Sequence, residues 1–360
     1  MTSLKDPNPL RFAPSVQEMT TVLRGLYLSL MGREPDALGL AHWLRTWQQG
    51  GDLGNIAASL LASDEYRTFA ATSPRKAGTD DYTQHAVRAA AQVLIDAPVV
   101  IVDVGAQDLG NEEHVYAALG HLGVPHRIVG FEPLEHRRQE RQLNAGCELS
   151  LLPTFIGDGG IHTFHVNEPD ATSSLLPFNR EVTERLLELS TLRTVRTEPA
   201  TTMTLDDELA REHKVDMLKL DIQGFELTAL RHAMSVLQRT LVVHCEVSFA
   251  EIYQGQDLFS EVEQHLRRSG FYLVDLSTLC RYPLTGTPFP ASRDWLGWGD
   301  AVFFRRLPAG ASWRDLLVQS VLALVVYRKP SLAAWLARGL EHTPVAPYVA
   351  ALTTNGTPST

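Results

Sequence analysis

The segment from Val99 to Gly110, Val-Val-Ile-Val-Asp-Val-Gly-Ala-Gln-Asp-Leu-Gly, constrains the fold of this 360-residue chain more than any other. Its five β-branched residues around Asp103 predict a short strand that is buried on both faces, as strands of parallel sheets are. Gly105 and Gly110 allow a tight turn and a close approach of the backbone to a ligand. A strand, a glycine turn and a helix are how an open α/β sheet forms a nucleotide pocket at the carboxyl ends of its strands.

Glu132 ends a second apolar strand, Arg127-Ile-Val-Gly-Phe-Glu. Dinucleotide sites place their ribose-binding acid about 20 residues after the glycine turn, which is where Glu132 stands. The alternative is a solvated acid at the strand end, or part of the N-terminal cap of the following helix. Because both features are in register, we favour ribose binding for Glu132.

Charged residues also stand on strands that otherwise read as buried. The strand Met217–Ile222 carries Lys219 and Asp221, and the strand Leu241–Val247 carries Glu246 near its end. Burying a charge is unfavourable unless the charge is paired or functional. Asp221, at the carboxyl end of a central strand, is predicted to face the ligand crevice. The alternative is a hydrogen-bonded polar network that ties Lys219 and the loops together.

Two further sets of residues allow two interpretations each. Asp158 follows the segment Phe155-Ile-Gly, where an acid can meet the amino group of an adenine, or serve as a turn aspartate before Gly159-Gly160. Trp295 and Trp298 can stack on a sugar face, but packing in the core or a lid is the interpretation we favour.

Composition excludes several classes of protein. A hydrophobic content of 44% and a charged content of 21% are ordinary for a globular protein, and the formal net charge of −10 argues against a nucleic-acid partner. The three cysteines form no metal-binding or disulfide pattern. The first residues have no apolar signal segment, and no stretch reaches ~18 apolar residues, so we expect a cytoplasmic protein without a membrane span.

The order of the elements predicts an α/β protein with a doubly wound, mostly parallel seven-stranded sheet. We expect helices over 112–122, 134–144 and 180–189, a linker over 73–81 and a short strand over 163–166. The apolar segment Trp313–Tyr327 is expected to pack on the sheet or in a homodimer interface, with a membrane-surface helix as the alternative. The expected parts are a disordered arm (1–15), a small all-α domain (16–75), the sheet domain (85–306) and C-terminal helices (307–352).

The N-terminal part resembles a small helical bacterial domain of unknown function. The resemblance rests on Leu26–Trp43, with its Gly-Arg-x-Pro-Asp segment, and on Ser63-Asp-Glu-Tyr66. It identifies a module rather than an activity.

The sheet domain resembles the FkbM family of S-adenosylmethionine-dependent methyltransferases. The most specific matching piece is Lys219-Leu-Asp-Ile-Gln-Gly-Phe-Glu226. Other matching pieces are Val102-Asp-Val-Gly-Ala106, Gly130-Phe-Glu-Pro133, Thr172-Ser-Ser-Leu175, Thr204-Leu-Asp206, Glu246-Val-Ser-Phe249 and Asp300-Ala-Val-Phe303. The resemblance implies a Rossmann-like methyltransferase fold, S-adenosylmethionine (SAM) as cofactor, and O-methylation of a sugar, glycan or polyketide-like metabolite.

The resemblance also implies roles for the candidate residues. Asp103, Gly105, Ala106 and Gln107 would face the methionine end of the cofactor, Glu132 its ribose and Asp158 its adenine. Asp221 would be the general base or orient the substrate, and the catalytic set would include Glu246 and Lys219, with Asp300 sharing the work. The first turn departs from the family's usual Gly-Ala-Asn-x-Gly, because here it reads Gly105-Ala-Gln-Asp-Leu-Gly110. Asp221 and Glu246 could hold Mg²⁺, but no clear third ligand is present, so we expect no metal.

Two other functions are kept as alternatives. A nicotinamide-dependent oxidoreductase would use the same kind of sheet, yet Ala106 and Gln107 interrupt the Gly-x-Gly-x-x-Gly turn that binds a pyrophosphate. A non-catalytic protein that binds SAM, or recruits a partner through its N-terminal domain, is the third reading. The carboxylates at Glu132, Asp221 and Glu246 argue mildly against this loss of activity.

Overall fold

The computed structural model describes residues 16–31, 35, 37–49, 56, 59–60, 74–108, 113–144 and 146–353. The chain divides into two compact units, residues 1–82 and 83–360. Helix α5 (Pro74–Leu94) extends across this division, so the segment 74–81, for which the sequence predicts a linker, is helical.

The first unit contains the helices α1 (Val16–Met31) and α2 (Ala37–Gln48). Its buried side chains are Met19, Leu23, Tyr27, Ile56 and Leu60, and Trp43 donates a hydrogen bond to the Tyr27 hydroxyl at 3.0 Å. Most of the Gly-Arg-x-Pro-Asp segment, and all of Ser63–Tyr66, lie outside the described residues. The resemblance of this unit to a bacterial helical domain therefore stays a prediction.

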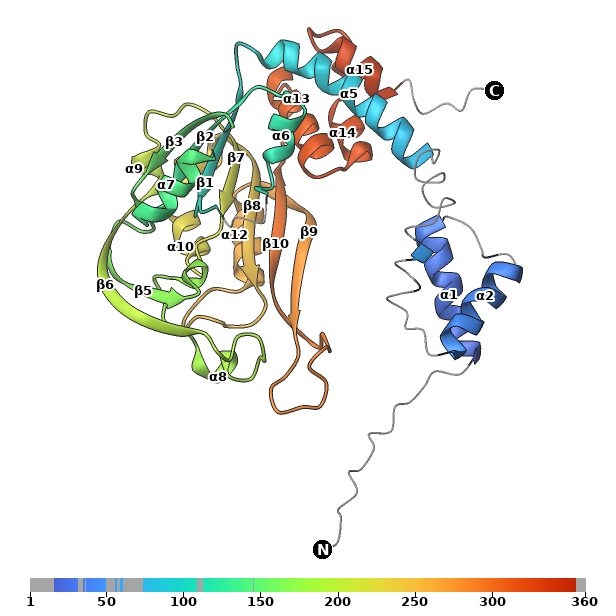
Figure 1. The fold of residues 1–360 in the computed structure, drawn as a ribbon. Coiled ribbons are helices and arrows are strands. Elements are labelled where there is room, and N and C mark those ends of the chain that lie inside the picture. The colour runs from blue at the N-terminus through green and yellow to red at the C-terminus, as the bar shows by residue number, and fades with distance from the viewer. Residues whose placement is uncertain are drawn as a thin grey trace, which may run out of the picture. The chain divides into compact units, whose positions relative to one another are not determined.

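The second unit is built on a seven-stranded sheet with the order β3-β2-β1-β7-β8-β10-β9, which confirms the predicted fold class (Figure 1). Its strands are β1 (Val99–Val104), β2 (His126–Phe131), β3 (Glu148–Leu152), β7 (Val215–Leu220), β8 (Thr240–Ser248), β9 (Phe271–Tyr282) and β10 (Trp295–Arg305). The first five strands in this order are parallel, while β10 runs antiparallel to both of its neighbours.

Alternation along the central strands gives the sheet two different faces. Val102 and Val104 of β1 belong to the main apolar cluster, together with Leu218 of β7 and Val243 of β8. Residues from four helices complete that cluster: α9 (Leu205–Glu208), α10 (Glu226–Arg231), α11 (Met234–Arg239) and α12 (Phe259–Arg268). Asp103, paired in register with Lys219, points to the opposite face. Helix α6 (Ala117–His121) follows β1 in the chain, and helix α7 (Glu135–Leu143) follows β2.

A second, three-stranded sheet was not expected. It has the order β4-β6-β5, with β4 (Phe155–Ile156), β5 (Ile161–Glu168) and the long strand β6 (Arg193–Met203). The predicted helix over 180–189 is also wrong beyond its first turn, since α8 spans only Arg180–Thr183. The chain after α8 turns instead toward the β9–β10 hairpin, where the Leu187 amide donates to the Pro283 carbonyl at 3.0 Å.

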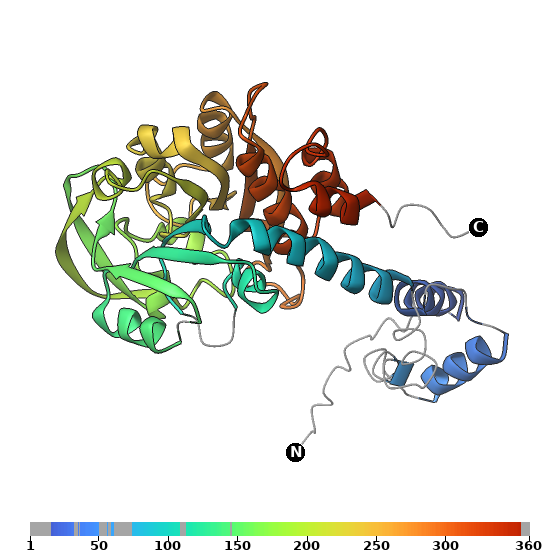
Figure 2. The same cartoon turned by 90° about the horizontal axis from the view of Figure 1, so that it is seen from above.

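The C-terminal segment forms the helices α13 (Trp313–Val321), α14 (Pro330–Leu336) and α15 (Ala346–Thr353), with the π-helical turn η2 (Leu322–Val326) between the first two. In both views these helices gather beside the part of α5 that follows Thr83 (Figures 1 and 2). A buried ion pair joins α13 to the sheet, because both oxygens of Asp216 on β7 accept from Arg314 at 2.8 and 2.9 Å. None of the described helices is long and apolar enough to cross a membrane.

The Arg314–Asp216 pair gives a stability prediction. Replacing Arg314 by Leu leaves a buried carboxylate without its partner, which should lower the free energy of unfolding by about 3–5 kcal/mol. The double variant Arg314→Leu, Asp216→Asn should recover part of that loss. Arg185→Leu removes an ion pair with Glu181 whose side chains are 60% and 77% exposed, so this control should change stability by about 0–1 kcal/mol. Urea denaturation measures all three, and equal effects of Arg314→Leu and Arg185→Leu would contradict the prediction.

Candidate active site

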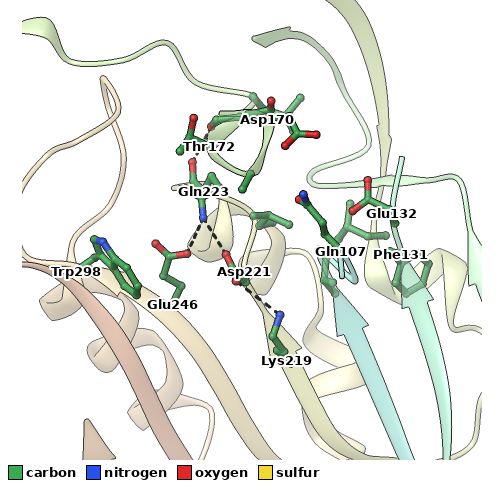
Figure 3. A pocket seen from close by; sticks show the side chains of 18 of the residues that line it. Gln107, Phe131, Glu132, Asp170, Thr172, Lys219, Asp221, Gln223, Glu246 and Trp298 are labelled. Atoms are coloured by element: carbon green, nitrogen blue, oxygen red, sulfur yellow. Dashed lines mark hydrogen bonds and ion pairs between the residues drawn. The ribbon is translucent and has the colours of Figure 1, made fainter. Parts of the chain in front are cut away.

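A cavity of about 700 Å³ lies at the carboxyl ends of β1, β2, β7 and β8. Its size falls in the range of about 300–1,000 Å³ that small-molecule sites occupy. Gly105, Gln107, Glu132, Lys219, Asp221 and Glu246 line it, as do residues of β9, β10 and the small sheet. In Figure 3, Glu132 and Gln107 lie on one side of the cavity, Glu246 and Trp298 on the other, and Asp221 between them.

The turn after β1 lies directly against the end of β7. Gly105 has a φ of +80°, and a Cβ atom there would be 2.0 Å from the Asp221 carbonyl oxygen. The amides of Gly105 and Ala106 both donate to the Phe131 carbonyl, at 3.0 and 3.1 Å. Glycine is therefore required at position 105 by both the conformation and the contact. Ala106 is fully buried and does not line the cavity, whereas Gln107 does. Gly110 lies outside the described residues.

Gln107 faces the guanidinium of Arg137. In the orientation that satisfies both groups, the amide oxygen of Gln107 accepts from Arg137 Nε at 2.9 Å and from Nη2 at 3.2 Å. Arg137 also holds the carboxylate of Asp170, which lines the cavity, through Nε at 2.9 Å and Nη2 at 2.5 Å. Gln107 thus connects the β1 turn to the segment that follows β5.

Contrary to the prediction from the sequence, Asp103 does not line the cavity. Its carboxylate is fully buried, accepts from the Tyr116 hydroxyl at 2.6 Å and pairs with Lys219 at 3.1 Å. Lys219 Nζ also lies 3.7 Å from Asp221. Burial works to lower the pKa of Lys219, but the charges of Asp103 and Asp221 outweigh it and raise that pKa above its ordinary value. Lys219 is thus a permanent cation that positions two carboxylates.

Asp221 and Glu246 meet at the centre of the cavity. The side-chain amide of Gln223 donates to Asp221 Oδ1 at 3.0 Å and to Glu246 Oε2 at 2.9 Å (Figure 3). Burial, and then the charge of Asp221, raise the pKa of Glu246 well above its usual range. Burial also opposes ionisation of Asp221, but Lys219 and hydrogen bonds from Glu246 and Gln223 lower its pKa. The two pKa values are thus shifted in opposite directions, and Glu246 is the member of the pair that binds a proton more readily.

Two residues that orient this pair were not among the predicted site residues. The Tyr253 hydroxyl lies 2.9 Å from Gln223 Oε1, which directs the amide nitrogen of Gln223 toward the two carboxylates. Gln223 itself adopts a φ of +56°, and the carboxylate of Glu226 accepts from the Ile222 and Gly224 amides at 2.9 and 3.0 Å. The signal in the sequence was the Lys219–Glu226 motif, in which every polar residue has a partner.

Glu132 lines the cavity at the end of β2, as predicted, and is only 4% exposed. Its carboxylate accepts from the Leu134 amide at 2.8 Å, and burial raises its pKa to about 7. Asp158, by contrast, does not line the cavity. Its Oδ1 bonds His162 at 2.7 Å and the Gly160 amide at 2.9 Å. The turn interpretation of Asp158 therefore describes its surroundings, and the adenine contact is not supported.

The remaining wall comes from the strands at the far edge. Asp300 of β10 lies opposite Glu246 in the sheet register, with His244 Nε2 3.7 Å from its carboxylate. Trp298 packs with a small apolar cluster that includes Ile252 and donates to the Tyr282 hydroxyl at 2.7 Å. Both Trp298 and Asp300 line the cavity. Among the described residues, no three His, Cys, Asp or Glu side chains are grouped so that they could hold a metal ion.

Comparison with known proteins names the family of this site. Residues 103–273 match the family model of the methyltransferase FkbM domain. The chain contains an FkbM methyltransferase domain. The matched range includes Asp103, Glu132, Asp221 and Glu246, whereas Asp300 lies beyond its end.

Solved structures similar to the chain include a putative methyltransferase from Thermoplasma acidophilum, 12% identical, with 58% of this chain and 69% of that one covered and a TM-score of 0.29. The plantazolicin methyltransferase in complex with SAH is 10% identical over 81% and 99% of the two chains, with a TM-score of 0.30. A putative tRNA (m1A22) methyltransferase from Streptococcus pneumoniae is 13% identical over 77% and 97%, with a TM-score of 0.28. No curated protein matches the chain.

Gly105 offers a test of the close packing between the turn after β1 and the end of β7. Gly105→Ala should abolish binding of S-adenosylhomocysteine (SAH) and lower the free energy of unfolding, because the added Cβ collides with the Asp221 carbonyl. Gly123 has a similar φ of +72° but no atom within 4 Å of an added Cβ. Gly123→Ala should therefore show only backbone strain of roughly 1–2 kcal/mol and retain SAH binding. Calorimetric titration and urea denaturation measure both, and SAH binding by Gly105→Ala would refute the close-approach argument.

The raised pKa of Glu132 predicts a pH dependence of cofactor binding. With a pKa of about 7, Glu132 is mostly protonated at pH 6 and ionised at pH 8, and an ionised carboxylate accepts hydroxyl hydrogen bonds more strongly. The affinity for SAH should rise between these pH values. Glu132→Gln should weaken binding by about tenfold at pH 8 and flatten the profile. Glu135→Gln, on the exposed start of α7, is the matched control, and a wild-type slope that survives in Glu132→Gln would exclude Glu132 as its source.

Proposed function

We propose that this protein is a SAM-dependent O-methyltransferase that methylates a hydroxyl of a sugar, glycan or polyketide-like metabolite. The observation that carries the proposal is the pair of carboxylates, Asp221 and Glu246, that Gln223 bonds together at the centre of the cavity of an FkbM domain. A hydroxyl acceptor must lose its proton as it is methylated, and an ionised carboxylate beside it is suited to take that proton.

The cavity fits the proposed cofactor in shape and charge. Gly105 lets the β1 turn pack directly against the end of β7 at the cavity wall. Glu132 lines the cavity at the end of β2 and is the proposed acceptor for the ribose hydroxyls. Among the described residues, six carboxylates but only one lysine, and no arginine, line the cavity. When bound, SAM supplies a methyl group already activated on a sulfonium. The acidic lining favours that cation, whereas the pyrophosphate of a nicotinamide cofactor would find few partners there.

The residues of the chain divide the remaining work. Asp221, ionised beside Lys219, is the proposed base that receives the acceptor proton, and Gln223 keeps its carboxylate oriented. Glu246, hydrogen-bonded to Asp221 and to Gln223, helps to hold the Asp221 carboxylate in place. Lys219 positions Asp103 and Asp221 and does not itself take part in the proton transfer. The wall of Trp298, Tyr282 and Thr278 faces the space in which the acceptor would lie.

Asp221→Asn tests this assignment. It should reduce turnover by about 10²- to 10⁴-fold, because the amide cannot accept the proton, while SAM affinity stays within about threefold. Turnover is followed as SAH release with a panel of methyl glycosides, oligosaccharides and hydroxylated lactones. Asp158→Asn, a carboxylate outside the cavity lining, should behave as the wild type. Full turnover by Asp221→Asn would remove Asp221 as the base. Binding of NAD rather than SAM or SAH would refute the proposed function itself.

A further inference from the structure

Among the described residues that line the cavity, His114 has a side-chain nitrogen for which the structure shows no hydrogen-bond partner. The residue follows the β1 turn and lines the cavity, and its side chain is 14% exposed. Its ring stacks on Tyr116, with ring centroids 5.2 Å apart. Within the part of the chain that the structure describes, the buried Nε2 atom has no hydrogen-bond partner. A buried polar atom without a partner is unfavourable in the free protein and is explained when a ligand supplies the partner.

The surroundings of the ring determine which nitrogen carries the proton. His114 Nδ1 lies 3.6 Å from Asp103 Oδ2, the oxygen that also accepts from Tyr116. A lone pair pointing at a carboxylate would be repelled, so Nδ1 carries the hydrogen. Burial lowers the pKa of His114; the charge of Asp103 opposes this, Arg141 and Lys219 add to it, and Asp108 raises the pKa slightly. The ring is therefore neutral at pH 7, and Nε2 presents a lone pair that can only accept.

The position of His114 indicates which part of SAM could supply a donor. Glu132, the proposed ribose ligand, ends β2, whereas His114 is tied to Asp103 on the face that Asp103 shares with Lys219 of β7. The ribose and the reacting methyl are thus assigned to Glu132 and Asp221, which leaves the methionine tail for the region of the β1 turn. That tail carries a carboxylate, which only accepts, and an ammonium, which only donates.

We propose that His114 Nε2 accepts a hydrogen bond from the α-ammonium of SAM, and that Asp103 positions the ring through Nδ1. The inference rests on SAM being the cofactor, as proposed above. It also changes the role of Asp103, which reaches the methionine end through His114 instead of contacting it. His114, which follows the β1 turn in the chain, would thus add a contact to the methionine part of SAM in a protein whose turn carries Gln107.

Four ligands separate the parts of the cofactor in calorimetric titrations of the full-length protein. SAM and SAH both carry the α-ammonium and the α-carboxylate, decarboxylated SAM keeps the ammonium but lacks the carboxylate, and 5′-methylthioadenosine lacks both. His114→Phe keeps the stacked ring and removes the acceptor. It should weaken SAM, SAH and decarboxylated SAM by roughly 10- to 100-fold, as for a lost hydrogen bond to a charged group, and leave 5′-methylthioadenosine within about twofold. His114→Gln, which offers an amide oxygen, should restore part of the loss.

His121→Phe is the matched control, because His121 lies on α6 in the same segment and its side chain is 62% exposed. This variant should bind all four ligands as the wild type does. Unchanged SAM and SAH affinity in His114→Phe would overturn the inference, as would an equal loss for 5′-methylthioadenosine, which would indicate a general structural role. A loss for SAM with none for decarboxylated SAM would instead assign His114 to the carboxylate and refute the ammonium contact. A wild type that binds neither SAM nor SAH would refute the proposed function rather than the role of His114.

Discussion

The buried cation of Lys219 holds the site together. Lys219, on β7, lies between Asp103 on β1 and Asp221 just after the end of β7, 3.1 and 3.7 Å from their carboxylates. The Asp103 side chain has no exposure to solvent and that of Lys219 only 13%, so these two charges must stay paired, and their pairing fixes the ends of β1 and β7 relative to each other. The Tyr116 hydroxyl, which donates to Asp103 and accepts from Arg141 at 3.1 Å, extends this network to the segments that follow β1 and β2.

The same network divides the carboxylates by protonation. Lys219 lies close to Asp221 and lowers its pKa, while Glu246, one strand further along, forms no ion pair within the described part of the chain and has a raised pKa. Gln223 bonds to both and accommodates either arrangement of the shared proton. Environment, rather than residue type, therefore assigns different tasks to two neighbouring acids. Glu132 and Glu226 show the same effect, since burial raises the pKa of each to about 7.

The elements that could be predicted from the sequence are those whose burial leaves a pattern. The apolar runs of β1, β7 and β8 identify central strands, and charged residues within such runs identify the site. β6 could not be predicted in this way, because Arg193-Thr-Val-Arg-Thr-Glu-Pro-Ala-Thr-Thr-Met is polar and half exposed and gains its partners from β5 and β4, not from the core. The helix over 180–189 failed because the Leu187 amide bonds with the β9–β10 hairpin, which is distant in sequence.

The candidate site shows the same division between local pattern and distant contact. Position relative to a strand end was enough to bring Gly105, Gln107, Glu132, Asp221 and Glu246 to one cavity. It was not enough for Asp103 and Asp158, whose partners, Tyr116 with Lys219 and His162 with Gly160, turn their carboxylates away.

The opposite end of the sheet is held by polar contacts to helix α13. There the guanidinium of Arg314, whose side chain is only 9% exposed, pairs with Asp216. Gln319 of α13 donates to the carbonyls of Leu241 and Arg305 at 3.0 Å each. These contacts satisfy polar groups at the start of β7 and β8, and they tie the C-terminal helices to the sheet away from the cavity. The strands are thereby anchored through residues 314 and 319, which lie outside the matched range of 103–273. The polar groups at the carboxyl ends of β1, β2, β7 and β8 line the cavity, at the other end of the sheet from these anchoring contacts.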